Sequence, residues 1–245
     1  MKQMGLALEA PTVRNWGGRR KGAGRYKKRK GSWVSHGPRP FHDWRHPVHV
    51  TLRVRRGVPN LRGFKLAKAI AEGLRRAASA KWARQVARRK TFRVIHYSTQ
   101  KDHLHLIVEA SSKVALGRGM QGLVSGIARR VNNRLGRRGA VFGDHYHGHA
   151  MRSPVEVRHA IVYVLKNYEK HPEPIPERSS VATRGIDPCS SAAWFKGWAE
   201  ATAPPGLAPP VAEPHTWLLR VGWKQHGLLE RHEGPKGRPG PLHID

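Results

Sequence analysis

The chain has 245 residues, of which 46 are lysine or arginine and 16 are acidic, and its formal net charge is +30. That charge indicates a polyanionic partner, for which nucleic acid is the default, and it leaves the fold and the chemistry open. The single cysteine excludes an intrachain disulfide, and no apolar run approaches the roughly 18 residues that cross a bilayer. We therefore expect a cytoplasmic protein without a membrane partner.

Charge divides the chain into three parts. Residues 1–45 hold 12 Lys+Arg and 2 acidic residues, residues 46–172 hold 26 and 6, and residues 173–245 hold 8 of each. The first part is rich in glycine and cations and poor in apolar residues, so we expect a disordered arm. The arm is either a solvated charge run or a segment that binds phosphate backbones. The cations predicted to do so are Arg19, Arg20, Lys27, Lys28 and Arg29.

The middle part carries the periodic patterns of regular structure. Apolar residues alternate with polar ones from Val48 to Arg55, which predicts a strand. From about Leu61 to Arg84, apolar residues recur every four positions among alanines and cations, which predicts a helix with a basic outer face. Residues 92–98 and 103–110 alternate again on either side of a polar turn, as in a hairpin.

Two helices and one further strand are predicted next. Apolar residues recur at helical spacing from Met120 to Leu135, and Gly136 is placed to end this helix. Residues 140–151 are predicted to be the last strand or an extended segment. Ser153 then caps a helix that runs to about Lys170.

The order of predicted elements is therefore βαββαβ followed by a helix. It favours an α+β ferredoxin-like sandwich, in which a central antiparallel sheet carries two helices on one face. Residues 103–110 would form a central strand. The proline-rich residues 173–245 are predicted to be an extended or irregular tail, in which two apolar stretches, residues 192–198 and 216–223, are candidates for docking on the core.

Two histidines in the second strand of the hairpin raise the question of chemistry. His103 and His105 share one face because successive side chains of a strand alternate. Paired histidines on a strand often serve packing or hydrogen bonding, but at this spacing they can also converge on one divalent cation. Tyr163 and Asn167 project from one face of the last helix. If that helix lies beside the histidines, it brings an amide ligand and a nucleophile to the ion, although a helical tyrosine is more often a core residue.

This pattern resembles the single-tyrosine HUH transposases, in particular the REP-associated tyrosine transposase branch. The resemblance rests on His-hydrophobe-His in a central strand, on a later helical tyrosine with an amide four positions on, and on the sequence Gly-x-Val-Phe-x-Asp at Gly139 to Asp144. It covers roughly residues 41–171. Relatives often have Met-Pro-Asn before the first histidine, where this chain has Gln100-Lys101-Asp102.

The resemblance implies a catalytic domain over residues 46–172 that cleaves and rejoins single-stranded DNA beside hairpins, in a bacterial, nucleoid-associated protein. His103, His105 and Asn167 would be ligands of Mg²⁺ or Mn²⁺, and Tyr163 would be the nucleophile. The ion would polarise the scissile phosphate while the phenolate attacks it. A homodimer remains open as an assembly state.

Other interpretations stay open. A non-enzymatic, domesticated nucleic-acid-binding protein would share the fold and charge, and a rolling-circle replication initiator or relaxase would share the metal and tyrosine. The histidines at 145, 147 and 149 form either a second metal site or a DNA-contacting surface. A last group of predicted nucleic-acid contacts lies on and after the second helix: Arg129, Arg130, Arg134, Arg137 and Arg138.

Overall fold

A computed structural model describes residues 41–79, 90–143, 145–170, 186–200 and 205–234. The described residues all fall in one compact unit. The cations predicted at residues 19–29 and the last turns of the helix predicted to reach Arg84 lie outside these ranges. Among the described helices, none has the length and apolar character needed to span a bilayer.

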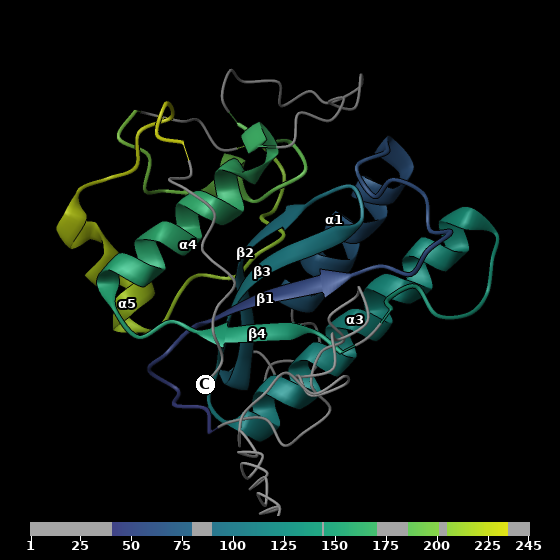
Figure 1. The fold of residues 1–245 in the computed structure, drawn as a ribbon, viewed down its shortest axis with the longest axis horizontal. Helices are drawn as coiled ribbons and strands as arrows, with labels where there is room; N and C mark the ends of the chain where they lie inside the picture. The colour runs from purple at the N-terminus through teal and green to yellow at the C-terminus, as the bar shows by residue number, and fades with distance from the viewer. Residues whose placement is uncertain (1–40, 80–89, 144, 171–185, 201–204, 235–245) are drawn as a thin grey trace, which may run out of the picture. The chain divides into compact units, whose positions relative to one another are not determined.

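An antiparallel sheet of four strands forms the centre of the molecule (Figure 1). The strand order is β2-β3-β1-β4, and each neighbouring pair is antiparallel. Together with the element order βαββαβ, this arrangement confirms the predicted α+β ferredoxin-like sandwich, with β3 inside the sheet. The strands are β1 (Val48–Arg53), β2 (Phe92–Thr99), β3 (His103–Ala110) and β4 (His147–Ala150).

Helices α1 (Phe64–Ala78) and α3 (Lys113–Leu135) pack on one face of this sheet. Apolar side chains of the strands point to them, so Val50, Leu104 and Leu106 are at most 1 % exposed. Gly136 ends α3 in the left-handed conformation with φ 61°, as its position in the sequence predicts. The two helices and the strands they cover form the first hydrophobic core.

Helix α4 (Pro154–Lys166) packs against β2 and β3 from the opposite face. It begins with a capping box in which the Ser153 hydroxyl accepts the Glu156 amide and the Glu156 side chain accepts the Ser153 amide. The helix predicted to run to about Lys170 is α-helical as far as Lys166, and a 3-10 helix, η1 (Asn167–Lys170), continues it. Within the strand or extended segment predicted over residues 140–151, β4 pairs with β1 over four residues, and Phe142 forms an isolated antiparallel bridge with Val54.

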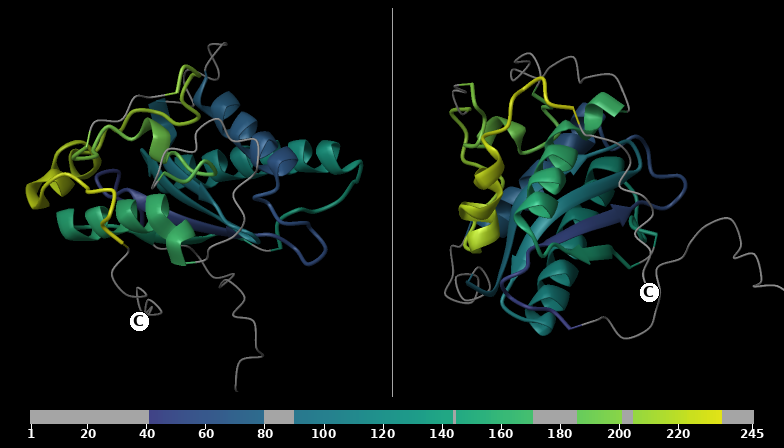
Figure 2. Two further views of the ribbon diagram at one scale, coloured as in Figure 1. Left: turned by 90° about the horizontal axis from the view of Figure 1, so that it is seen from above. Right: turned by 60° about the vertical axis from the view of Figure 1, so that its left-hand side comes forward.

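The C-terminal segment completes the core on the α4 side, where it lies next to α4 in both views of Figure 2. It contains η2 (Ala192–Trp194), α5 (Trp217–Arg220) and η3 (Gly222–His226). Trp198 and Trp223 come from the two stretches predicted to dock, and they are 6 % and 2 % exposed. The docking interpretation is therefore confirmed for both stretches.

Two buried carboxylates tie this segment to the sheet. Asp187 forms a bidentate ion pair with Arg62, at 2.8 and 3.0 Å, and both side chains are at most 1 % exposed. Glu109 in β3 accepts the backbone amides of His215 and Thr216 and the Thr216 hydroxyl. These contacts satisfy charges that would otherwise be costly to bury, so they fix where the segment lies.

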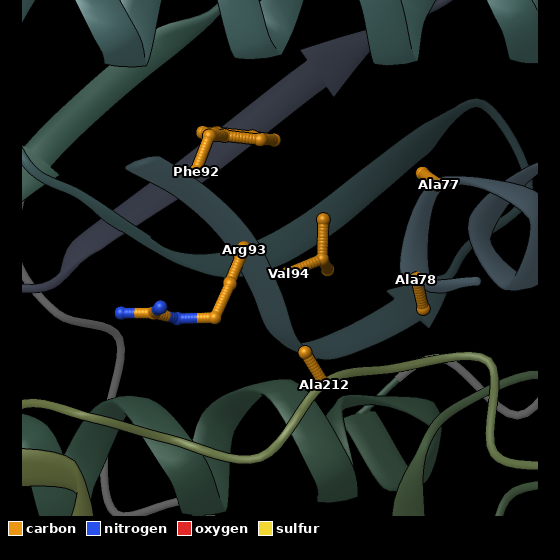
Figure 3. Close-up of a pocket in the computed structure, with 6 residues that line it drawn as sticks. All are labelled: Ala77, Ala78, Phe92, Arg93, Val94 and Ala212. Atoms are coloured by element: carbon orange, nitrogen blue, oxygen red, sulfur yellow. The ribbon is translucent and has the colours of Figure 1, made fainter. Parts of the chain in front are cut away.

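A small hollow between α1, β2 and Ala212 has mostly apolar walls (Figure 3). Its polar lining residue, Arg93, turns away from Ala77 and Ala78, and its Nε donates to Glu109 Oε2 at 3.1 Å. The hollow therefore offers no group for proton transfer or nucleophilic attack. The titratable side chains that gather outside the two cores lie elsewhere, on the α4 face of the sheet.

Candidate active site

Two histidines of β3 bring their ring nitrogens together on the α4 face. The Nε2 atoms of His103 and His105 are 2.9 Å apart, and the ring planes are almost perpendicular. Leu104 between them points to the first core and is 1 % exposed. The alternation of β3 therefore places both imidazoles on one face, where their Nε2 atoms point to a common position.

Asp102 sets the orientation of the first imidazole. The Oδ1 atom of Asp102 lies 2.7 Å from His103 Nδ1. Partial burial acts to raise the pKa of Asp102, but the hydrogen bond with His103 and the electrostatic attraction of His103 and Arg53 outweigh it and hold the pKa below its usual value. An ionised carboxylate accepts the Nδ1 proton, which leaves the Nε2 lone pair of His103 facing His105.

The second imidazole is held from β1. His105 pairs with Thr51 in the sheet register, and its Nδ1 lies 3.2 Å from Thr51 Oγ1 and 3.3 Å from His49 Nε2. Burial, together with the nearby His149 and His147, lowers the pKa of His49 to about 4. His49 is therefore neutral at neutral pH. If His105 Nδ1 donates its proton to Thr51 Oγ1 or to His49 Nε2, the Nε2 atom of His105 also carries a lone pair.

This donor set fits a divalent cation. Two lone pairs 2.9 Å apart repel each other unless a proton or a cation lies between them. Neighbouring ligands of an octahedral ion with bonds of about 2.1 Å are about 3 Å apart, which is close to this separation. No three His, Cys, Asp or Glu side chains in the described ranges are grouped to hold a metal, so a further ligand would have another chemistry, such as an amide.

Asn167 supplies an amide with free capacity. It is the first residue of η1, and its side chain is 1 % exposed. Within the described part of the chain, neither its Oδ1 nor its Nδ2 has a hydrogen-bond partner. Buried amides are normally paired, so this one has an unfilled acceptor that suits a hard cation.

Tyr163 of α4 lies against the same histidines. Its ring centroid is 5.0 Å from that of His105 and 5.8 Å from that of His49, in edge-on contacts. Burial raises the pKa of Tyr163 above its ordinary value, so the phenol is un-ionised at neutral pH. Its use as a nucleophile requires a positive charge close to the phenol oxygen.

Tyr168 has different surroundings. It belongs to η1, and the Lys166 ammonium lies 6.0 Å from its ring centroid. Burial and the neighbouring carboxylate of Glu169 raise its pKa. The structure thus brings Tyr163, and not Tyr168, into contact with the histidine rings.

Comparison with known families identifies the domain that carries these residues. The sequence model of the family described as "Transposase IS200 like" matches residues 65–164, which include both β3 histidines and Tyr163. The matched residues are therefore similar to an IS200-like transposase. This match supports the predicted transposase family, and Asn167 lies just beyond the matched range.

Two further comparisons concern solved structures and curated proteins. One solved structure, "Structure of the REP associates tyrosine transposase bound to a REP hairpin", has 16 % identity and a TM-score of 0.40, covering 56 % of this chain and 74 % of that one. No curated protein matches the chain.

The arginines predicted to contact DNA lie away from the histidine pair. Arg129, Arg130 and Arg134 belong to α3, which covers the face opposite the histidines. Arg137 and Arg138 follow α3 in the loop that leads back to β4. Arg134 lies 3.6 Å from Glu72 of α1, and Arg130 donates to the Gly126 carbonyl. The structure therefore does not bring the arginines of α3 to the histidine pair.

Two of the three alternating histidines near β4 do reach the histidine face. His149 pairs with His49, and His147 pairs with Thr51, so both project to the same face as His105. His149 Nε2 lies 3.3 Å from Glu156 Oε1, whereas His145 is exposed. These contacts give His149 a carboxylate partner on α4.

Three residues of this site have no role that the sequence patterns predict: His49, Thr51 and Asp102. Each of them contacts the Nδ1 atom of His103 or His105, whereas the Nε2 atoms would hold the ion. The alternation of β1 places His49 and Thr51 on a polar face, and this pattern could have indicated that they lie near the site. The missing information was the register between β1 and β3, which decides that Thr51 faces His105.

Proposed function

We propose that this protein cleaves and rejoins single-stranded DNA through a covalent bond to Tyr163. The observation that carries the proposal is the contact between the Tyr163 ring and His105, at 5.0 Å, beside two Nε2 atoms 2.9 Å apart. A phenol nucleophile thus lies next to a pair of nitrogen ligands in a transposase domain. Each of these groups comes from the same chain, so a second copy is not required for the site.

The residues divide the chemistry between them. His103, His105 and Asn167 would hold Mg²⁺ or Mn²⁺, which when bound supplies positive charge for the scissile phosphate and for the phenolate. Asp102, Thr51 and His49 contact the Nδ1 atoms of the histidines, so the two Nε2 atoms are the ring nitrogens that would hold the ion.

Bond changes at the phosphate follow from this arrangement. The Tyr163 oxygen loses its proton to solvent and forms a bond to phosphorus, while the bond from phosphorus to the 3′ oxygen breaks and that oxygen takes a proton. The products are a 5′-phosphotyrosine and a free 3′-OH. Attack of a 3′-OH on the phosphotyrosine reverses these steps, so rejoining consumes no ATP.

The substrate we propose is single-stranded DNA beside a hairpin. The chain has a net charge of +30, which favours a polyanion. Its histidine and tyrosine pattern resembles the REP-associated branch, which implies hairpin-flanked sites. A protein of this kind would act in the cytoplasm on the bacterial nucleoid.

The test is a covalent adduct. The full chain is incubated with Mg²⁺ or Mn²⁺ and labelled hairpin oligonucleotides with single-stranded flanks, including repeats that flank its own gene. We expect an SDS-resistant protein–DNA adduct on the peptide that contains Tyr163. Tyr163→Phe should abolish the adduct while leaving DNA binding within about twofold, because the phenol oxygen alone is removed. Tyr168→Phe is the matched control and should retain the adduct.

Other results would redirect the proposal. An adduct on Tyr168 would keep the reaction class and refute the assigned nucleophile. Metal-dependent cleavage without any adduct would make water the nucleophile. Binding without cleavage on every hairpin would favour a non-enzymatic, domesticated transposase. Nicking of plasmid origins in preference to hairpins would favour a replication initiator or relaxase.

A further inference from the structure

One arginine projects from the sheet beside the histidine pair. Arg53 is the last residue of β1 and pairs directly with His103 of β3. Directly opposed residues of antiparallel strands project to the same face with their β-carbons about 5 Å apart. Arg53 therefore rises from the α4 face next to the first imidazole, whereas the arginines of α3 cover the opposite face.

The backbone around Arg53 is held firmly while its side chain is exposed. The Arg53 carbonyl accepts the Gly143 amide at 3.0 Å, and the next residues are fixed by bonds from Val54 to Asp102 and from Arg55 to Val141. The Arg53 side chain is 73 % exposed. A guanidinium on a rigid strand end can meet a ligand without reorganising the fold.

The ion pair of Arg53 leaves its donors available. Arg53 Nη1 lies 3.9 Å from Asp102 Oδ2, which is too long for a hydrogen bond, and the Asp102 side chain is itself 55 % exposed. Asp102 meanwhile uses Oδ1 for His103. An exposed pair at this distance contributes little to stability, so the guanidinium can exchange Asp102 for a phosphate at small cost.

We propose that Arg53 binds a phosphate of the DNA strand beside the histidine pair and so positions the scissile phosphate under Tyr163. This inference rests on the proposed function. A guanidinium donates two parallel hydrogen bonds to the oxygens of one phosphate, which fixes the strand in register. Arg55 and Arg56, both exposed in the loop after β1, continue the positive charge from this point.

The experiment pairs protein substitutions with neutral phosphates. The full chain carrying Tyr163→Phe, which prevents cutting, is titrated in Mn²⁺ with hairpin oligonucleotides. In each oligonucleotide one phosphate of the flank is replaced by a methylphosphonate, and the Kd is measured by fluorescence anisotropy. The variants are Arg53→Ala, Arg53→Lys and, as a matched control, Arg118→Ala, which removes an exposed arginine from α3 on the opposite face.

We expect coupling at one position of the flank. With Arg53 present, one neutral linkage should weaken binding about tenfold, as loss of a charge-assisted contact does. Arg53→Ala should weaken binding to the natural strand by a similar factor, and the same neutral linkage should then cost nothing more. Arg53→Lys should recover part of the affinity, and Arg118→Ala should weaken binding less than Arg53→Ala and show no coupled position.

Two outcomes would overturn the inference. Additive effects of Arg53→Ala and of the neutral linkage at every position would mean that Arg53 contributes only diffuse charge. An equal loss of DNA affinity for Arg53→Ala and Arg118→Ala would also mean that Arg53 contributes only diffuse charge. The adduct assay separates this failure from failure of the proposed function: an adduct without coupling sinks only the role of Arg53, and coupling without an adduct sinks only the chemistry.

Discussion

Removing the carboxylate of Asp102 should weaken metal binding at the histidine pair. The hydrogen bond of 2.7 Å between Asp102 Oδ1 and His103 Nδ1 fixes the ring and its tautomer. Loss of such a partner typically lowers metal affinity by about 10 to 100-fold. Because the Asp102 side chain is 55 % exposed, water can replace part of the contact. We therefore expect Asp102→Ala to cost about tenfold, or about 1.4 kcal/mol.

The assay is the rate of adduct formation as a function of Mn²⁺ concentration. Asp102→Ala should raise the Mn²⁺ concentration that gives half of the maximal rate about tenfold, and it should leave the maximal rate nearly unchanged. Asp102→Asn retains an oxygen acceptor and should recover most of the shift. Glu213→Ala, which removes an exposed carboxylate paired with Lys196, controls for the loss of one negative charge. A dependence on Mn²⁺ equal to that of the unchanged protein would show that Asp102 does not orient a metal ligand.

Two further predictions concern buried groups. Asn167→Ala should lower the rate of cleavage at limiting Mn²⁺. It should leave the free energy of unfolding unchanged or raise it by about 1 kcal/mol, since the amide has no hydrogen bond to lose among the described residues. A large loss of stability in urea would mean that the amide is structural. Burial lowers the pKa of His96 from 6.5 to about 4. Between pH 6.5 and about pH 4, the unfolded chain therefore binds a proton that the folded protein does not bind. Stability should therefore be complete above pH 6.5 and fall as the pH drops. His96 should account for about 2 kcal/mol between pH 7 and pH 5, and a urea profile for His96→Asn as steep as that of the unchanged protein would contradict this.

The sheet and its first core could be predicted because their pattern is local. Alternation in β1 and β3 reports which side chains face the helices, and Gly136 and Ser153 mark helix ends through their own backbone chemistry. The end of α4 was predicted less well, because a non-local contact lies there. Lys166 ends α4 with its side chain buried beside the Arg231 carbonyl, a contact that helical periodicity does not encode.

The same distinction applies to the candidate site. His103, His105 and Tyr163 could be brought together from strand alternation and helix order. The partners that orient the imidazoles could not, because they depend on how β1 pairs with β3 and on the turn before β3. Nor does a sequence show that the amide of Asn167 is buried without a hydrogen-bond partner among the described residues, since burial depends on the segment packed beside α4.

The C-terminal segment gives the protein a high contact order. Asp187 contacts a residue 125 positions earlier, and Thr216 contacts one 107 positions earlier. During synthesis the histidine strand and the tyrosine helix therefore leave the ribosome before the residues that cover α4 have been made. We expect folding to finish slowly, because such long-range contacts cost loop entropy before they contribute stability. A gene copy truncated before Asp187 would still encode both histidines and the tyrosine, but not the residues that pack against α4.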